Sequence, residues 1–213
     1  MSFSDAVVVA TVASEKKVTD TQDDLDSDEL MVGRSITLTV NSILWVNTKL
    51  PDYNPSVPVP SQLTVGAAGW SSLQGVEYEM ALQDSSRLET GNTYVIPLTK
   101  YRTGEGWGLT SASGVLPYNG GVIGQGEHQG VANVTLQATD VEFSPLAVSL
   151  LGKSATAMTT ALSSATPHTG VSQVDTPDDR LAAYNAATYP SDPAEEEPEP
   201  DADFPPISDP GVD

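Results

Sequence analysis

The two histidines of the chain are the side chains best suited to acid–base or metal chemistry near neutral pH. His128 follows an acidic residue in a Gly-rich segment, and His168 follows a proline. Neither has the HxxxH or HxxE spacing of a zinc site, so a metal centre would need ligands from distant parts of the chain. A hydrolase using His128 or His168 stays open as an alternative, because a Ser-His-Asp triad can assemble from distant residues. No Gly-x-Ser-x-Gly elbow accompanies them, and we expect both histidines in surface loops.

An acidic run supplies a candidate cation site. Asp24, Asp26 and Asp28 alternate as at the start of an EF-hand calcium loop. That loop also needs glycine at its sixth position and glutamate at its twelfth, and here those positions hold Glu29 and Ser35. We therefore expect a solvated acidic loop with, at most, weak calcium binding, and we predict no cofactor and no catalytic site.

Acidic residues dominate the whole chain. It carries 29 acids against 9 bases, a formal charge of −20, and the excess is present in residues 1–170 and in residues 171–213. DNA, RNA and anionic membrane surfaces each require a basic face, so we predict no nucleic-acid partner and no membrane insertion. A basic protein partner fits this charge better. The chain has no cysteine, which excludes disulfides, a thiolate nucleophile and a cysteine-based metal site.

The last part of the chain, residues 171–213, is predicted to be an acidic, Pro-rich tail or linker that is largely disordered. From Leu181 to Asp213 it has nine acids, seven prolines and neither Lys nor Arg. Such a segment has too little apolar surface to offset the entropy that ordering would cost. The densest acids of the tail are its predicted partner-binding residues: Glu195, Glu196, Glu197 and Glu199. Solubility alone is the alternative explanation of their charge.

Residues 1–170 are predicted to form one mainly β domain. Residues 6–12 are a Val-rich apolar run, which is typical of a buried strand. Apolar and polar residues alternate over residues 35–41, which predicts a strand whose even-numbered residues face the core. The alternation slips by one over residues 43–46, which indicates a bulge or a tight bend.

Two turn signals and two helices complete this organisation. Pro97, inside an apolar run, predicts a strand at a sheet edge or one with a bulge. Asn119-Gly120, between two apolar pairs, predicts a tight hairpin. Ser144-Pro145 supplies an N-cap and a first helical residue, which predicts a helix near residues 145–163. A second short helix is predicted near residues 178–187.

Three short motifs resemble a known family. Val7–Val12, Val40–Trp45 and Gly91–Leu98 are similar, in order and type, to strands of the small exported β-barrel proteins of actinobacteria. That family has an oligonucleotide/oligosaccharide-binding-like (OB-like) barrel, related in shape to the tissue-inhibitor-of-metalloproteinase fold. The resemblance implies an OB-like barrel of about five to seven strands with one packed helix, over residues 5–165. Metalloproteinase inhibition does not carry over, because the N-terminal cysteine that engages zinc in those inhibitors is absent.

Exposed aromatic side chains bind ligands in barrels of this kind. Trp45, Trp70 and Trp107 are therefore predicted partner-binding residues, with core packing as the alternative. With the acidic charge, they favour a non-enzymatic binding or scaffold module that engages a protein or another non-nucleic-acid ligand. One alternative is a structural subunit of a large assembly, such as a virion or a surface array, whose tail lies along a neighbour; the hydrolase is the other. We recognise no export signal at the N-terminus and expect an extracellular location if Met1 replaces a removed signal.

Overall fold

A computed structural model describes residues 3–18, 29–73, 76–100, 106–141, 144–172 and 177–188. This part of the chain is mainly β, with three α-helices and short 3-10 turns. The strands are β1 (Ala6–Val18), β2 (Glu29–Val46), β3 (Gln62–Leu73), β4 (Val76–Glu79), β5 (Thr93–Lys100), β6 (Trp107–Leu109), β7 (Leu116–Pro117), β8 (Gln125–His128) and β9 (Val131–Thr135). The helices are α1 (Pro145–Leu150), α2 (Ala155–Ser163) and α3 (Pro177–Thr188).

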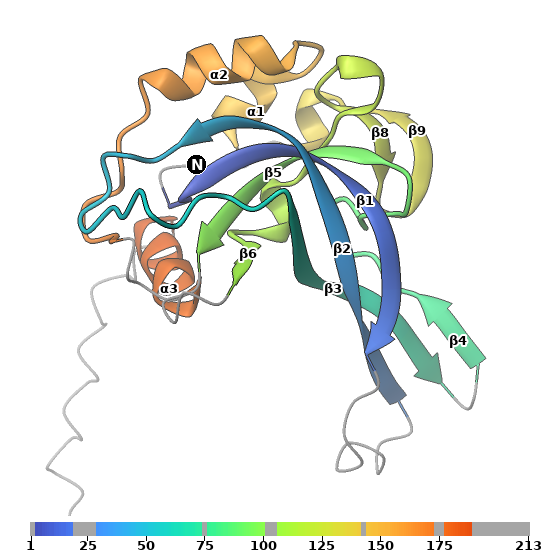
Figure 1. Ribbon diagram of the computed structural model, residues 1–213. Coiled ribbons are helices and arrows are strands. Elements are labelled where there is room, and N and C mark those ends of the chain that lie inside the picture. Colours follow the sequence, from blue (N-terminus) through green and yellow to red (C-terminus); the bar gives the residue numbers. More distant parts are fainter. Residues whose placement is uncertain are drawn as a thin grey trace, which may run out of the picture.

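Seven of the described strands form one antiparallel sheet in the order β4-β3-β2-β1-β5-β6, with β7 also paired to β5. β1, β2 and β3 form a meander, and β5 returns over a long connection to pair with the other edge of β1. This order is a Greek key. The sheet curls into an open half-barrel, and β8 and β9 form a separate hairpin (Figure 1). The prediction of a mainly β, barrel-like fold is confirmed.

β1 is buried on both faces along its first half. Its even-numbered residues from Ala6 to Val12 belong to the barrel core, whereas Val7 and Val9 belong to a second apolar core on the outer face. A strand buried on both sides needs apolar residues at every position, which explains why residues 6–12 show no alternation. The predicted buried strand is therefore confirmed.

β2 follows the predicted alternation and carries the predicted slip. Ile36 and Leu38 are fully buried in the barrel core, between half-exposed polar neighbours. The pairing of β2 with β1 skips one residue between Trp45 and Ile43 and another between Ser42 and Val40. These irregularities are β-bulges, which bend a strand and increase its twist, so they help the sheet to curl.

β5 is an inner strand of the sheet, so the prediction of a sheet edge or a bulge at Pro97 is wrong. It lies between β1 on one side and the short strands β6 and β7 on the other. The carbonyl oxygen of Pro97 accepts from the Thr110 N–H at 3.0 Å, so its nitrogen faces the same side. There the proline falls between the residues that pair with β7 and those that pair with β6, where no ladder hydrogen bond requires its missing N–H.

The predicted hairpin at Asn119-Gly120 is also wrong. β7 pairs with β5 and β8 pairs with β9, so the apolar pairs on either side of Asn119-Gly120 do not pair with each other. The Asn119 side chain instead holds the start of β5. Its Oδ1 accepts from the Thr93 N–H at 3.0 Å, and its Nδ2 donates to Asn92 Oδ1 at 2.8 Å.

Helices α1 and α2 cover the outer face of the sheet at β1 and β5 (Figure 1). Their apolar side chains complete the second core: Ala147, Leu150, Met158 and Leu162. The predicted helix near residues 145–163 is thus present, but it is divided into two. Gly152 has a φ of 75°, and its N–H donates to the carbonyl oxygen of Ile123 at 2.9 Å instead of continuing the helix.

Helix α3 docks beside the start of β1 through one buried arginine. The Arg180 guanidinium lies 2.9 Å from Asp5 Oδ2 and donates to the carbonyl oxygens of Phe3 at 3.0 Å and Ser172 at 2.7 Å. The Asp5 carboxylate also accepts from the Lys100 N–H at 2.7 Å. Burial raises the pKa of the Asp5 carboxyl, and the charge of Arg180 acts in the opposite direction.

The folded body therefore extends beyond the boundary predicted at residue 170. Val171 is buried, and α3 confirms the predicted second helix near residues 178–187. Residues 189–213, which hold most of the predicted acidic tail, lie outside the described residues.

Truncation of a core side chain of β2 tests which residues of this strand face the barrel core. Leu38→Ala removes a fully buried side chain, so the free energy of unfolding should fall by about 2–5 kcal/mol. Thr37→Ala and Thr39→Ala change half-exposed residues on the other face and should each cost less than about 1 kcal/mol. Urea unfolding of the three variants measures this; equal losses at all three positions would contradict the register.

Removal of α3 tests whether the buried ion pair belongs to the folded body. Deleting residues 173–213 leaves the Asp5 carboxylate buried without Arg180, and stability should fall by about 3–5 kcal/mol. Deleting residues 189–213 is the matched control, since it keeps every described contact and should leave the urea midpoint nearly unchanged. Indistinguishable midpoints for the two truncations would show that α3 does not stabilise the barrel.

Candidate functional site

The long strands continue past the barrel into a projecting arm (Figure 1). We define the arm as residues 14–18 of β1, 29–33 of β2, 70–73 of β3 and all of β4. Every residue from Ala13 to Val18 is exposed, and so is every residue of β4. The arm is therefore built from the same hydrogen-bonded strands as the barrel, but without the burial that stabilises them there.

One face of the arm, its inner face, is centred on Trp70. The Lys17 ammonium lies 4.3 Å from the centroid of the Trp70 ring, and the Arg87 guanidinium lies 5.5 Å from it. Both distances are those of cation–π contacts. Lys17 Nζ also donates to Glu77 at 2.6 Å. Because Trp70 lies opposite Glu79 in the pairing of β3 with β4, Glu77 and Glu79 share this face.

Arg34 joins the arm to the barrel from β2. Its side chain is fully buried and donates to the Glu15 carboxylate, to the carbonyl oxygen of Ala68 at 2.8 Å and to that of Arg87. A buried guanidinium is tolerated only with such a set of acceptors, so these bonds fix β1, β2, β3 and the segment before β5 together.

Arg87 makes the matching contacts from the segment before β5. Its guanidinium ion-pairs with Glu89, and it donates to the carbonyl oxygens of Gly69 at 3.2 Å and Met80 at 3.0 Å. Glu79 lies 3.7 Å away and is largely exposed. Arg87 thus holds the corner where β3 enters the arm and β4 leaves it.

A buried carboxylate, that of Glu127, holds Arg87 in turn. Glu127 is 1 % exposed and accepts four hydrogen bonds. The backbone N–H groups of Arg87 at 3.0 Å, Leu88 at 3.1 Å and Gly130 at 2.6 Å donate to it, as does the Tyr94 hydroxyl at 2.7 Å. Burial, reinforced by the hydrogen bond to Glu127, raises the pKa of Tyr94, so this hydroxyl stays a donor.

Glu127 lies in β8, and the hairpin of β8 and β9 is fixed by its turn and by hydrogen bonds to the segment before β5. Gln129 and Gly130 have φ of 52° and 78°, as a type I′ turn requires. The Gln129 N–H donates to the carbonyl oxygen of Ser85 at 3.1 Å, and Ser86 Oγ donates to that of Glu127 at 3.2 Å. The hairpin and the segment before β5 are therefore bound to each other along several residues.

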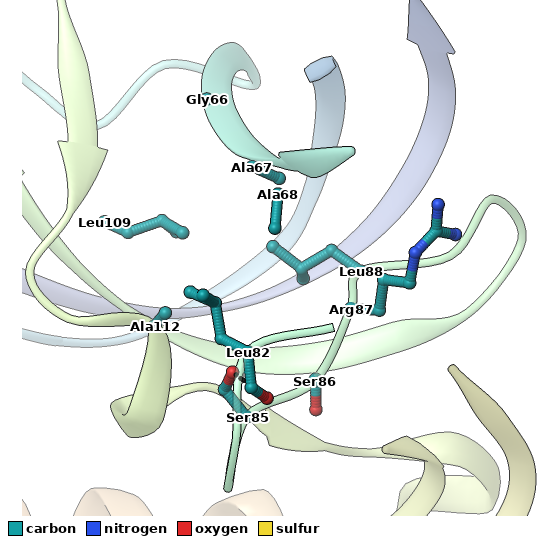
Figure 2. A pocket seen from close by; sticks show the side chains of 10 residues that line it. All are labelled: Gly66, Ala67, Ala68, Leu82, Ser85, Ser86, Arg87, Leu88, Leu109 and Ala112. Atoms are coloured by element: carbon teal, nitrogen blue, oxygen red, sulfur yellow. Dashed lines mark hydrogen bonds between the residues drawn. The ribbon is translucent and has the colours of Figure 1, made fainter. Parts of the chain in front are cut away.

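A small cavity lies beside this segment, with β3 and Leu109 of β6 in its lining (Figure 2). It has a volume of about 270 Å³, and Figure 2 shows Ala67 and Ala68 of β3 on one side and Leu82 on the other, with the Arg87 guanidinium pointing away. The hydroxyls of Ser85 and Ser86 are already hydrogen-bonded to backbone carbonyls. The lining therefore suits an apolar group and offers no free charge to a polar ligand.

The other face of the arm, its outer face, carries exposed apolar side chains together with the polar Lys16 and Ser71. Val76 and Tyr78 alternate with the two glutamates of β4, so they point away from Trp70. Val18 alternates with Lys17 and also lies on this face. The exposed fractions are 43 % for Val18, 52 % for Val76 and 55 % for Tyr78.

The predicted tryptophan surface is not gathered in one place. Trp107 is only 7 % exposed and packs in the barrel core. Trp45 packs half-buried against the outer core, and Trp70 lies on the arm. Of the three, only Trp70 lies beside the exposed surface of the arm.

His128 does not lie in a surface loop, so that prediction is wrong. It ends β8 and is 8 % exposed, because the segment around Ser85 covers this strand. His168 is half-buried and stacks on Phe3, with ring centroids 4.7 Å apart. Among the described residues, neither imidazole is hydrogen-bonded to a serine hydroxyl or to a carboxylate. A Ser-His-Asp arrangement is therefore not assembled within that part of the chain.

Two further predicted sites lie outside the described residues: Asp24, Asp26 and Asp28, and Glu195, Glu196, Glu197 and Glu199. Within the described ranges, no group of three or more histidine or acidic side chains is placed to hold a metal ion.

Three residues that organise this region were missed by the sequence analysis. The sequence does contain a signal for Arg34, because the alternation of the strand puts it on the same face as the buried Ile36 and Leu38. A charged residue at an inward position of an alternating strand needs a buried partner. Arg87 and Glu127 left none, because the contacts that join them to each other and to β3 and β5 span many residues of sequence.

Replacement of the buried carboxylate tests its role. Glu127→Gln puts an amide NH2 among N–H donors, so the free energy of unfolding should fall by about 2–4 kcal/mol. Tyr94→Phe removes only one of the four donors and should cost about 1–2 kcal/mol. Guanidinium unfolding measures both, and a glutamine variant as stable as the wild type would refute the assigned role.

None of the helices in the described ranges has the length and apolarity needed to cross a bilayer. Neither a protein-family model nor a curated protein matches the chain.

Proposed function

We propose that this protein is a non-enzymatic binding module that engages another protein through the outer face of its arm. The observation that carries the proposal is the exposure of Val18, Val76 and Tyr78 on the arm, the part of the sheet that projects from the barrel. Exposed apolar residues on one face of a sheet favour association, since burying them removes apolar surface from water. A partner would supply the burial that the arm lacks.

The shape of the arm favours a protein over a small molecule as the ligand. A sheet face is flat and open, whereas small ligands are held in concave pockets of about 300–1,000 Å³. The cavity beside the segment before β5, at about 270 Å³, lies below that range, and its apolar lining suits an apolar side chain of a partner.

The net charge of the chain favours a basic protein as the partner. The chain has a formal charge of −20, so a basic protein surface would be attracted over a long range and an acidic one repelled. The acids Glu195, Glu196, Glu197 and Glu199 would add to this field, and they remain part of the proposal as an attracting segment.

A structural subunit of a large assembly is the second candidate. The same arm favours it, because an arm that projects from a barrel can lie against a second copy of the chain as well as against a different protein.

We further propose the relation to the small exported actinobacterial barrels. The three motifs that carry the resemblance belong to β1, β2 and β5, which are neighbours in the sheet. Their adjacency supports a shared barrel centre rather than three unrelated similarities.

A photocrosslinking amino acid placed on the outer face tests the proposal. With the crosslinker in place of Tyr78, exposure to light in cells of the source organism should give one discrete adduct. The same crosslinker in place of Ala182, which is exposed on α3, is the matched control and should not give that adduct. An adduct with another protein supports the binding module, and an adduct with a second copy supports the assembly subunit. Identical patterns from both positions, or none, would contradict both.

A further inference from the structure

We propose that the free edge of β4 takes up an extended segment of the partner in which Lys or Arg alternates with apolar residues. The partner would thereby add a strand to the arm. This inference rests on the proposed function and specifies the chemistry of the partner.

The backbone of β4 is available for such pairing. One edge of β4 pairs with β3 over Trp70–Leu73, and no strand in the described part of the chain pairs with its other edge. All four residues of β4 are exposed. An exposed edge strand presents unpaired N–H and carbonyl groups, and partner segments commonly extend a sheet at such an edge.

The side chains of β4 define what would fit opposite them. Glu77 and Glu79 lie on the inner face with side chains 51 % and 69 % exposed, and Val76 and Tyr78 lie on the outer face. Residues directly opposite in an antiparallel pair share a face and interact. A complementary strand therefore places basic residues beside the glutamates and apolar residues beside Val76 and Tyr78.

The existing contacts on the inner face already follow this pattern. Lys17 reaches Trp70 and Glu77, which gives a row that runs from a cation through an aromatic ring to an anion at the edge. A basic residue of the partner beside Glu77 would continue this row with a cation on the other side of the anion.

A second copy of this chain is a poor occupant of the same edge. Two β4 strands that continue the sheet around a two-fold axis would be centred on Glu77 or on Tyr78. The first register sets Glu77 against itself, and the second sets Glu77 against Glu79 of the other copy. Like charges directly opposite are unfavourable. A shift by one residue would instead place apolar residues of one strand on the charged face of the other.

Two synthetic peptides test the proposal on the full-length protein. One alternates Lys with Val, and its matched control has Glu in place of every Lys. At a concentration about tenfold above its Kd, the Lys peptide should slow hydrogen exchange of β4 amides, read by NMR, by about tenfold. The Glu peptide should not slow it. Protection by both peptides alike, or by neither, would overturn the proposal.

Charge reversal on β4 separates specific strand addition from non-specific binding of the peptides. The double variant Glu77→Lys, Glu79→Lys should protect its β4 amides with the Glu peptide and lose protection by the Lys peptide. Asp179→Lys on α3 is the control and should behave as the wild type does. An unchanged preference in the double variant would overturn strand addition. If crosslinking from position 78 still succeeds, the proposed function stands and only this inference fails.

Discussion

The Glu127 carboxylate is buried at 1 % exposure, and a charge in that position is tolerated only when its acceptor sites are occupied. Its four donors come from the segment before β5, from β5 and from the β8–β9 turn. These parts of the chain must therefore meet for the fold to be stable. The bonds also fix the backbone of Arg87, whose guanidinium holds the corner between β3 and β4. The direction in which the arm leaves the barrel thus depends on a carboxylate that lies in neither β3 nor β4.

The division between barrel and arm is visible in the residue types along a single strand, β1. β1 is apolar at every position from Ala6 to Ala10, where both faces are covered, and is polar from Ser14 to Lys17, where every residue is exposed. The barrel half is stabilised by burial and the arm half by ion pairs and cation–π contacts. Exposed ion pairs are individually weak, typically about 0–1 kcal/mol. The arm is for this reason the part of the sheet that its own contacts stabilise least.

Local sequence patterns predicted the elements whose stability is local or depends on one buried face. The alternation from Ser35 to Asn41, the bulge after it and the Ser144 N-cap are all present. The predictions failed where a distant residue decided the outcome. Asn119 has the turn chemistry of a hairpin, but its side chain bonds to Asn92 and Thr93 instead. Arg87 and Glu127 are linked across 40 residues, and no local pattern reports such a contact.

The buried arginines and Glu127 anchor the base of the arm, so the arm, which is the proposed docking surface, should be ordered before any partner binds. Backbone 15N relaxation of the free protein measures this order. Order parameters of about 0.85 are expected for Trp70, Ser71 and Val76–Glu79, as in β5 and the buried first half of β1. Values below about 0.6 there, with a rigid barrel, would show that the arm is flexible in the free protein and that the contacts at its base do not order it.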